Sequence, residues 1–158
     1  MTYEIRPFQT TDAADLSDLL NHTIQLGGST AYETAFDTAS FIREFHSEPG
    51  VIGTLVAQLG SEYCGFQTLF DVDPTSVAIA TFADQRVRRP QVGQALFVHT
   101  QKRAREHGAH RIIAKIRADN QQGLRYYRGL GFEDVDVIRA VPLADGTLVD
   151  RIVTWFTL

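Results

Sequence analysis

The stretch TFADQRVRRPQVGQALF, residues 81–97, decides the fold, because the sequence changes character within it. The run that leads into it, residues 76–83, is nearly all apolar, as is typical of a strand buried on both faces. Residues 84–91 then form a polar, arginine-rich loop, and a helix with apolar residues at helical spacing starts at Val92. A strand, a polar loop and a helix in this order can make an anion site, because the first turn of a helix has unpaired N–H groups and a partial positive charge.

The composition of this loop strengthens the prediction of an anion site. Arg86, Arg88 and Arg89 flank main-chain amides that could point at one anion, and Gly93 removes a side chain where a ligand would come close to the backbone. The glycine-lysine motif of nucleoside-triphosphate sites and the G-x-G-x-x-G motif of dinucleotide sites are both absent from the sequence. The loop therefore predicts an anionic ligand of another kind.

Helical and strand patterns alternate along the rest of the chain. Helices are predicted from the capping residues 10–12 to the break at residues 27–28, and over residues 37–46, 92–107 and 120–130. Strands are predicted over residues 3–7, 51–58, 63–70, 76–83, 111–117, 135–141 and 148–156. Strands and helices alternate in the second half and antiparallel hairpins occur elsewhere, so we expect an α/β (α+β) fold with a mixed sheet covered by helices on both faces.

Length and composition limit the class of protein. The chain has 158 residues, of which 44% are hydrophobic, so we expect a single domain, residues 1–158, that needs no disulfide or metal to fold. The sequence contains no run of 18 apolar residues and no signal-peptide pattern, and the lone Cys64 cannot form an internal disulfide. These features predict a cytoplasmic protein without a membrane partner.

The net charge of −4 conceals an uneven distribution. The balance is −10 over residues 1–85, +9 over residues 86–128 and −3 over residues 129–158, and nine of the 11 basic residues in the middle block are arginines. An anionic ligand would explain this block, and a solvated helix face is the simpler alternative. The acidic pI of about 5.7 and the absence of a reader motif argue against nucleic acid, and no set of residues with metal-ligand spacing is present.

Two motifs resemble the GCN5-related N-acetyltransferase (GNAT) family. Residues 88–93 lie at the positions of the family's acetyl-CoA loop, Arg/Gln-x-x-Gly-x-Gly/Ala. In the stretch ADNQQGLRYYRGLGF, residues 118–132, Asn120, Tyr127 and Gly131 followed by Phe132 match a later motif of the family in type and spacing. The loop departs from the pattern, because the family's first glycine is Gln91 here and the residue before it is Pro90, which has no N–H to offer.

The resemblance implies a GNAT-like, mostly antiparallel sheet of about seven strands and an N-acetyltransferase activity. Such an enzyme moves an acetyl group from acetyl-CoA, its co-substrate, to a primary amine of a small molecule by direct attack in a ternary complex, without a metal. The resemblance places acetyl-CoA against the end of a strand, the loop and the later motif, at Phe82, Ala83, Arg88, Arg89, Pro90, Gln91, Val92, Gly93, Gln94, Asn120, Tyr127 and Arg128.

The same resemblance makes Tyr127 the general acid that protonates the leaving thiolate. A phenol has a pKa of about 10, so it carries its proton at neutral pH. By spacing alone Tyr127 is an aromatic residue that fills a helix stripe, and Asn120 is equally a helix cap. Tyr126 lies 100° around the helix, and we expect that it cannot replace Tyr127 without a shift of the helix.

The residue that removes the amine proton is not defined by a motif. Glu33 is our candidate because it follows the break at residues 27–28, where GNAT proteins build the substrate site, and the other candidates are His22, His46, Asp71 and Asp84. Residues 21–24 and the loop around Tyr32 loosely resemble the phosphinothricin N-acetyltransferase branch, which acetylates small amino-acid-like molecules. The acidic balance of residues 1–85 would suit a cationic amine, although solubility explains it equally well.

Two alternatives to an active enzyme remain. Pro90 and Gln91 are compatible with a catalytically weak or inactive GNAT-like module that senses CoA or another anion, and the arginines alone would suit a protein-interaction domain. GNAT proteins are often dimers, so a homodimer is also expected, with the closing strands at 135–141 and 148–156 as edges that need cover.

Overall fold

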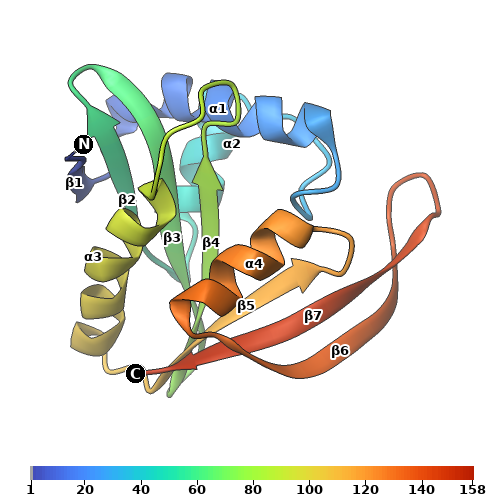
Figure 1. Ribbon diagram of the computed structural model, residues 1–158. Helices are drawn as coiled ribbons and strands as arrows, with labels where there is room; N and C mark the ends of the chain where they lie inside the picture. The colour runs from blue at the N-terminus through green and yellow to red at the C-terminus, as the bar shows by residue number, and fades with distance from the viewer. Residues whose placement is uncertain (1) are drawn as a thin grey trace.

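Alternating apolar residues and tight turns build a seven-stranded sheet in the computed structural model, which describes residues 2–158 (Figure 1). The strands lie in the order β1-β2-β3-β4-β5-β7-β6. They are β1 (Glu4–Pro7), β2 (Val51–Leu59), β3 (Glu62–Asp73), β4 (Ser76–Ala83), β5 (Arg111–Arg117), β6 (Glu133–Pro142) and β7 (Leu148–Thr157). All neighbouring strands are antiparallel except β4 and β5, which are parallel.

Helices cover both faces of this sheet. On one face lie α1 (Ala13–Leu26), which follows the short turn η1 (Thr10–Asp12), and α2 (Thr38–Ile42), which continues into the π-helical turn η2 (Arg43–Ser47); on the other lie α3 (Val92–Glu106) and α4 (Gln121–Leu130) (Figure 1). Aromatic residues fill the first layer, where Phe41, Phe45, Phe66 and Phe82 pack together. The second layer holds Phe97, Ile112, Leu124, Tyr127 and Phe132.

The sheet opens where β4 and β5 meet. The two strands pair only between Ser76–Ala78 and Arg111–Ile113, although β4 stays paired with β3 up to Ala83 and β5 stays paired with β7 up to Arg117. Each strand thus follows its antiparallel neighbour, and the two halves of the sheet diverge. The result is a V-shaped opening between the second half of β4 and the second half of β5.

The V leaves backbone groups of β4 without a strand partner. The Asp84 N–H donates to the Cys64 carbonyl at 2.9 Å, which makes Ala83 and Gly65 a non-hydrogen-bonded pair of the antiparallel ladder. By the alternation of such a ladder, Phe82 exchanges its backbone bonds with β3, whereas Thr81 and Ala83 direct theirs into the V.

The predicted order of elements agrees with the structure, and the prediction of a mixed, mostly antiparallel sheet with helices on both faces is confirmed. Two details differ. The helix predicted over residues 37–46 divides into α2 and the π-helical turn η2. The strand predicted to be buried on both faces is only half-buried at Ala80, Thr81 and Ala83, because the V exposes this end of β4. Among the helices of residues 2–158, none has the length and apolar character needed to cross a membrane.

Candidate active site

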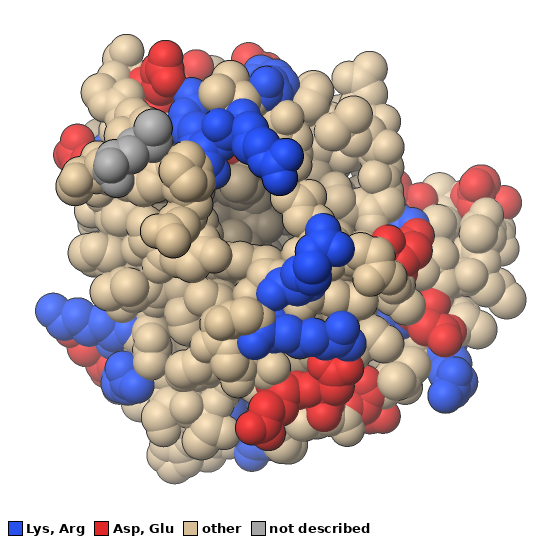
Figure 2. Space-filling model, viewed as in Figure 1, with Lys and Arg blue, Asp and Glu red and all other residues tan. Residues whose placement is uncertain are grey.

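A cavity of about 320 Å³ occupies the V. Its walls come from both sides of the sheet: α3 and α4 on one side, and α1 with the loop that follows it on the other. Figure 2 shows the corresponding hollow between basic side chains on the loop that precedes α3 and further basic side chains over α4. The cavity therefore passes through the sheet where the two parallel strands separate.

The arginine-rich loop ends at the cavity with an unusual backbone conformation. Gln91, the N-cap residue of α3, has φ 58° and ψ 26°, in the left-handed region that favours glycine. Its carbonyl accepts the Ala95 N–H at 3.0 Å, which begins the helix. Among residues 2–158 the N–H groups of Gly93 and Gln94 have no hydrogen-bond acceptor, so the first turn of α3 presents free donors beside the cavity.

The arginines of the loop differ in how many ion pairs they form with carboxylates. Arg86 binds Asp84 at 2.9 Å, and Arg89 binds Glu62 at 2.7 Å. The Arg89 side chain is only 9% exposed and lines the cavity, yet its Nη1 has no hydrogen-bond partner in the described part of the chain and lies 3.7 Å from Asp84. Arg88 is exposed and makes no ion pair within residues 2–158. Arg88 is therefore available to an anion, and the Nη1 of Arg89, which is in an ion pair with Asp84 but makes no hydrogen bond within residues 2–158, still has N–H groups to donate.

Three of the predicted contacts, Arg88, Pro90 and Arg128, lie outside the lining of the cavity. Arg128 is exposed and pairs with Asp134 at 2.7 Å, and Pro90 is exposed. The remaining members of the predicted acetyl-CoA set that do line it, apart from Arg89, are Phe82, Ala83, Gln91, Val92, Gly93, Gln94, Asn120 and Tyr127. The ladder separates the first two: the backbone groups of Ala83 face the V, and those of Phe82 face β3.

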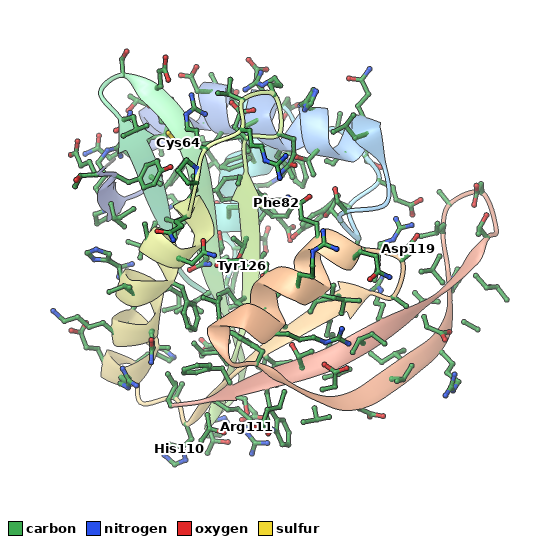
Figure 3. All side chains as sticks on the ribbon, viewed as in Figure 1. Cys64, Phe82, His110, Arg111, Asp119 and Tyr126 are labelled. Atoms are coloured by element: carbon green, nitrogen blue, oxygen red, sulfur yellow. The ribbon has the colours of Figure 1, made fainter. Side chains whose placement is uncertain are left out.

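Gly93 is needed for a contact that the sequence did not reveal. A Cβ built on Gly93 would lie 2.4 Å from Cε1 of Tyr126, and the Tyr126 hydroxyl donates to the Gly93 carbonyl at 2.8 Å. Figure 3 marks Tyr126 in the gap between α3 and α4. We expected a ligand to explain this glycine, but in the structure the ring of Tyr126 occupies the space that a side chain would need.

A buried polar network joins the two tyrosines of α4 to the middle of the sheet. Gln67 Nε2 donates to Thr81 Oγ1 at 2.9 Å and to the Tyr126 hydroxyl at 3.0 Å. Thr81 Oγ1 lies 2.8 Å from the Tyr127 hydroxyl. Because Thr81 Oγ1 already accepts from Gln67, its own proton can go to the Tyr127 oxygen, which leaves the Tyr127 proton free. The Tyr126 proton, in contrast, is held by the Gly93 carbonyl.

Tyr126 lies in the same cavity as Tyr127. We expected that it cannot replace Tyr127 without a shift of the helix, and in the structure both tyrosine rings line the cavity, with their centroids 4.8 Å apart. Tyr127 is nearly fully buried, and this burial raises the pKa of Tyr127 to about 12, so its hydroxyl keeps its proton at neutral pH. Burial likewise raises the pKa of Tyr126. The helix face alone does not distinguish the two residues; their hydrogen bonds do.

Asn120 combines the capping role with a second contact. Its Oδ1 accepts the Gly123 N–H at 2.9 Å, which caps α4, and its Nδ2 donates to the Ser29 carbonyl at 3.1 Å. Arg117 adds a bond to the Thr30 carbonyl at 3.3 Å. Together these side chains hold the loop after α1 against the ends of β5 and α4, where it closes one side of the cavity.

None of the candidate bases lines the cavity. Glu33 accepts the Ala144 N–H at 3.0 Å in the turn between β6 and β7, Asp71 pairs with His107, and Asp84 is held by the loop arginines. Burial raises the pKa of Asp84, but the hydrogen bonds from Arg86 outweigh it and lower the pKa overall, so this carboxylate is a weak base. His46 is exposed against Phe8, and His22 lies outside the cavity wall.

Tyr32, which the sequence predicts only as part of a loop, connects the cavity to a carboxylate. Tyr32 lines the cavity, and its hydroxyl donates to Glu44 Oε1 at 2.9 Å. Burial raises the pKa of Tyr32, and the neighbouring charge of Glu44 adds to this effect. The sequence does not predict that Tyr32 and Glu44 meet, because Glu44 lies in the π-helical turn η2.

Comparisons with known proteins agree with this geometry. The model of the acetyltransferase (GNAT) family matches residues 16–132. No curated protein sequence matches the chain. Among solved structures, yncA, a proposed acetyltransferase from Salmonella typhimurium solved with its cofactor acetyl-CoA, superposes with a TM-score of 0.87 at 19% identity, over 100% of this chain and 95% of that one.

Two further structures have similar scores. A ribosomal-protein-alanine N-acetyltransferase from Brucella melitensis has a TM-score of 0.85 and 21% identity over 98% of this chain and 99% of that one. A proposed phosphinothricin N-acetyltransferase has a TM-score of 0.84 and 19% identity over 99% of each chain. At these identities the likeness establishes the fold, and the family model, which spans most of the chain, establishes the family. The chain belongs to the GNAT acetyltransferase family.

Proposed function

We propose that this protein is an N-acetyltransferase that moves the acetyl group of acetyl-CoA to the primary amine of a small molecule in a ternary complex. The observation that carries the proposal is the cavity through the sheet, which has free N–H donors at one end and a buried, protonated tyrosine on its wall. A single continuous cavity allows two molecules to meet from opposite sides of the sheet.

The residues present fit acetyl-CoA. Three kinds of group suit the pyrophosphate: the free N–H groups of Gly93 and Gln94, the Nη1 of Arg89, which makes no hydrogen bond within residues 2–158, and the exposed Arg88. The loss of a donor at Pro90 is offset by these arginines. The backbone groups of Thr81 and the Ala83 N–H that face the V suit the amides of the pantetheine arm, which would add to the sheet as a strand does; the Ala83 carbonyl accepts from Gln85 Nε2 at 3.1 Å.

Acetyl-CoA supplies a thioester, from which the amine nitrogen takes the acetyl group as the carbon–sulfur bond breaks. The reaction therefore needs one proton removed from the amine and one delivered to sulfur. We propose Tyr127 as the donor, because the Gln67–Thr81 chain can leave its proton free whereas the Tyr126 proton is held by Gly93. A backbone N–H of β4 facing the V can stabilise charge on the thioester oxygen.

The proton acceptor is a separate proposal. Glu33 remains our candidate from the sequence, acting through water, because it lies in the loop that closes the cavity. Tyr32 is the better placed group, since it lines the cavity and is bonded to Glu44. Comparison of the Glu33→Gln and Glu44→Gln variants by the pH profile of kcat/KM distinguishes them: loss of the carboxylate that accepts the proton moves the acidic limb, and loss of the other does not.

The test of the proposed function is CoA-dependent stability followed by turnover. Acetyl-CoA should raise the melting temperature of the protein, since a ligand that binds only the native state stabilises it. Release of CoA thiol with a panel of primary amines should then be measured. Tyr127→Phe should lower kcat by about 100-fold with little change in the Kd of CoA, while Tyr126→Phe, the matched control, should lower it far less.

The outcomes separate the alternatives. Stabilisation by CoA without thiol release for any amine supports the alternative of an anion-sensing module. Pro90 and Gln91, which depart from the family's loop pattern, are the residues that suggest this alternative. If CoA does not stabilise the protein at all, both the N-acetyltransferase and the CoA-sensing module are contradicted. Equal kcat values for Tyr127→Phe and the native protein, with chemistry rate-limiting, would contradict the assignment of the acid.

The assembly and location of the protein are further proposals. The prediction that residues 148–156 form an edge is wrong, because β7 lies between β5 and β6. We propose a homodimer in which β6, an edge strand with exposed Val135, Val137 and Ile138, is covered by a second copy. Sedimentation of the native protein tests this. A cytoplasmic location is consistent with the free, buried thiol of Cys64.

A further inference from the structure

Two polar side chains lie in an otherwise apolar layer between the sheet and α4. Gln67 of β3 and Thr81 of β4 are directly opposite each other in the antiparallel register, so both side chains are on one face. Two residues away on each strand, the same face carries Leu69 and Ile79, which belong to the core that α3 and α4 cover. Gln67 is fully buried. A buried polar pair in such a layer is unusual, because apolar side chains fill it without needing hydrogen bonds.

The amide of Gln67 is arranged as a donor. Its Nε2 makes two hydrogen bonds, to Thr81 Oγ1 at 2.9 Å and to the Tyr126 hydroxyl at 3.0 Å, so both of its protons are used. Its Oε1 is buried and has no hydrogen-bond partner in the described part of the chain. An unpaired buried oxygen is unfavourable, so the stability of the fold alone does not explain a glutamine here. What this position provides is the pair of N–H donors.

These two donors set the direction of two hydrogen-bond chains. In the first chain, Tyr126 accepts from Gln67 and donates to the Gly93 carbonyl at 2.8 Å, so its proton is bound. In the second chain, Thr81 accepts from Gln67, and its single proton is then available for the Tyr127 oxygen, which lies 2.8 Å away. The Tyr127 oxygen thus receives a hydrogen bond, and its own proton is left for the cavity that Tyr127 lines.

A tyrosine that gives up its proton on this wall becomes a buried phenolate. The electron pair of the O–H bond stays on the Tyr127 oxygen as a negative charge. Burial makes this charge unfavourable and raises the pKa of Tyr127 to about 12, whereas the hydrogen bond with Thr81 lowers the pKa. Within residues 2–158, Thr81 is the only group that forms a hydrogen bond with the Tyr127 hydroxyl. A donor that is fixed before the reaction stabilises such a charge without rearrangement.

We propose that Thr81 and Gln67 are positioning residues for the proton transfer. Thr81 donates a hydrogen bond to the Tyr127 oxygen and stabilises the phenolate, and Gln67 holds the Thr81 hydroxyl in the direction that allows this. The proposal rests on the proposed function: the amine nitrogen bonds to the acetyl carbon, the carbon–sulfur bond breaks, and the sulfur takes the proton of Tyr127. A proton from water restores the phenol after the products leave.

The first test removes the hydroxyl of Thr81 but keeps the shape of the side chain. Thr81→Val should lower kcat by about 10- to 100-fold, as loss of one hydrogen bond to a developing charge does, with little change in the KM for acetyl-CoA. Thr81→Ser, which keeps the hydroxyl, should recover most of kcat. Gln67→Met should also lower kcat, because the Thr81 proton is no longer directed to Tyr127.

Thr68→Val is the matched control for these variants. Thr68 is a buried threonine of β3 whose hydroxyl lies 2.7 Å from that of Thr54, so the variant also loses one side-chain hydrogen bond. It should leave kcat unchanged.

Combination with Tyr127→Phe separates a positioning role from a structural one. If Thr81 acts through Tyr127, Thr81→Val should lower kcat no further once the hydroxyl of Tyr127 is absent. A reduction by the same factor in both backgrounds overturns the inference. A kcat of Thr81→Val equal to that of the native protein, with chemistry rate-limiting, also overturns it. Either result leaves the proposed acetyltransferase activity intact.

A second measurement does not depend on turnover. Difluorotyrosine is introduced in place of Tyr127, because fluorine lowers the pKa of a phenol and lets its ionisation be followed by fluorine NMR in the folded protein. Thr81→Val should raise the pH of half-ionisation by about 1–2 pH units, which is the same 10- to 100-fold factor, and Thr81→Ser should not. Equal midpoints with and without Thr81→Val overturn the inference. If no amine is acetylated, the proposed function fails, and these midpoints alone decide whether Thr81 stabilises the phenolate.

Discussion

Replacement of Gly93 by alanine tests the contact on which the geometry of the site depends. The new Cβ would lie 2.4 Å from Cε1 and 2.7 Å from Cζ of Tyr126, so the ring must move. The ring cannot move freely, because its hydroxyl is bonded to the Gly93 carbonyl and to Gln67. Gly93→Ala should therefore displace Tyr126 and disturb the network that reaches Tyr127.

The magnitude follows from three contributions. Overpacking of a filled site costs about 1–3 kcal/mol. Loss of the two hydrogen bonds of the Tyr126 hydroxyl costs about 1 kcal/mol each. Alanine in place of glycine inside a helix returns about 0.5–1 kcal/mol. We expect the free energy of unfolding of Gly93→Ala to fall by about 2–4 kcal/mol.

Urea unfolding measures this change, and α4 offers a matched control. A Cβ on Gly129 meets nothing within 4 Å, so Gly129→Ala should stabilise the protein by about 0.5–1 kcal/mol. The double variant Gly93→Ala/Tyr126→Leu should be more stable than the sum of the single effects, because leucine vacates the space that the Cβ needs. A stability of Gly93→Ala equal to that of Gly129→Ala, or additivity in the double variant, would refute the placement of the Tyr126 ring.

Three further predictions concern the loop, the helix cap and the acid stability. Gln91→Gly should stabilise the protein by up to about 1 kcal/mol in urea unfolding, because glycine relieves the left-handed conformation, while Gln94→Gly in the first turn of α3 should destabilise it. Asn120→Ala should lower the free energy of unfolding by about 1–2 kcal/mol through loss of the cap, and Asn120→Ser should recover part of it; equal loss for both would contradict a capping role. Burial raises the pKa of Asp12, but hydrogen bonds from Arg6 and other donors outweigh this and lower the pKa to about 2. The free energy of unfolding should therefore fall by about 2 kcal/mol between pH 4 and pH 2, as Asp12 is protonated. Asp12→Asn should lack this component in a pH series of unfolding experiments.

Most of the fold followed from local patterns. The apolar periods and turn residues predict all seven strands, and the change of character at residue 84 predicts the loop before α3. The π-helical turn η2 was not predicted, because no local motif marks it; its Phe45 packs among Phe41, Phe66 and Phe82. Such aromatic packing depends on partners that are distant in the sequence.

The candidate site was only partly predictable, for the same reason. Asn120 and Tyr127 were predictable because they lie at the spacing of a family motif. Gln67 has no such motif in its strand, and only the register of β3 with β4 places it beside Thr81. Arg151 belongs to a segment with a net negative charge, and only its pairing opposite Arg117 places it on the wall of the cavity. Residues from one segment were predictable; groups assembled across strands were not.

The short pairing of β4 with β5 has a mechanical consequence. Three residues on each strand join the two halves of the sheet along this seam, so the halves can twist against each other more easily than the strands within either half. Beyond that seam, Asn120 and Arg117 donate hydrogen bonds to the loop after α1 and hold it against the ends of β5 and α4. A molecule that bonds to both β4 and β5 would connect the two halves of the sheet at a second place. Slower amide exchange in β4 and β5 together would show that the two halves move as one rigid unit.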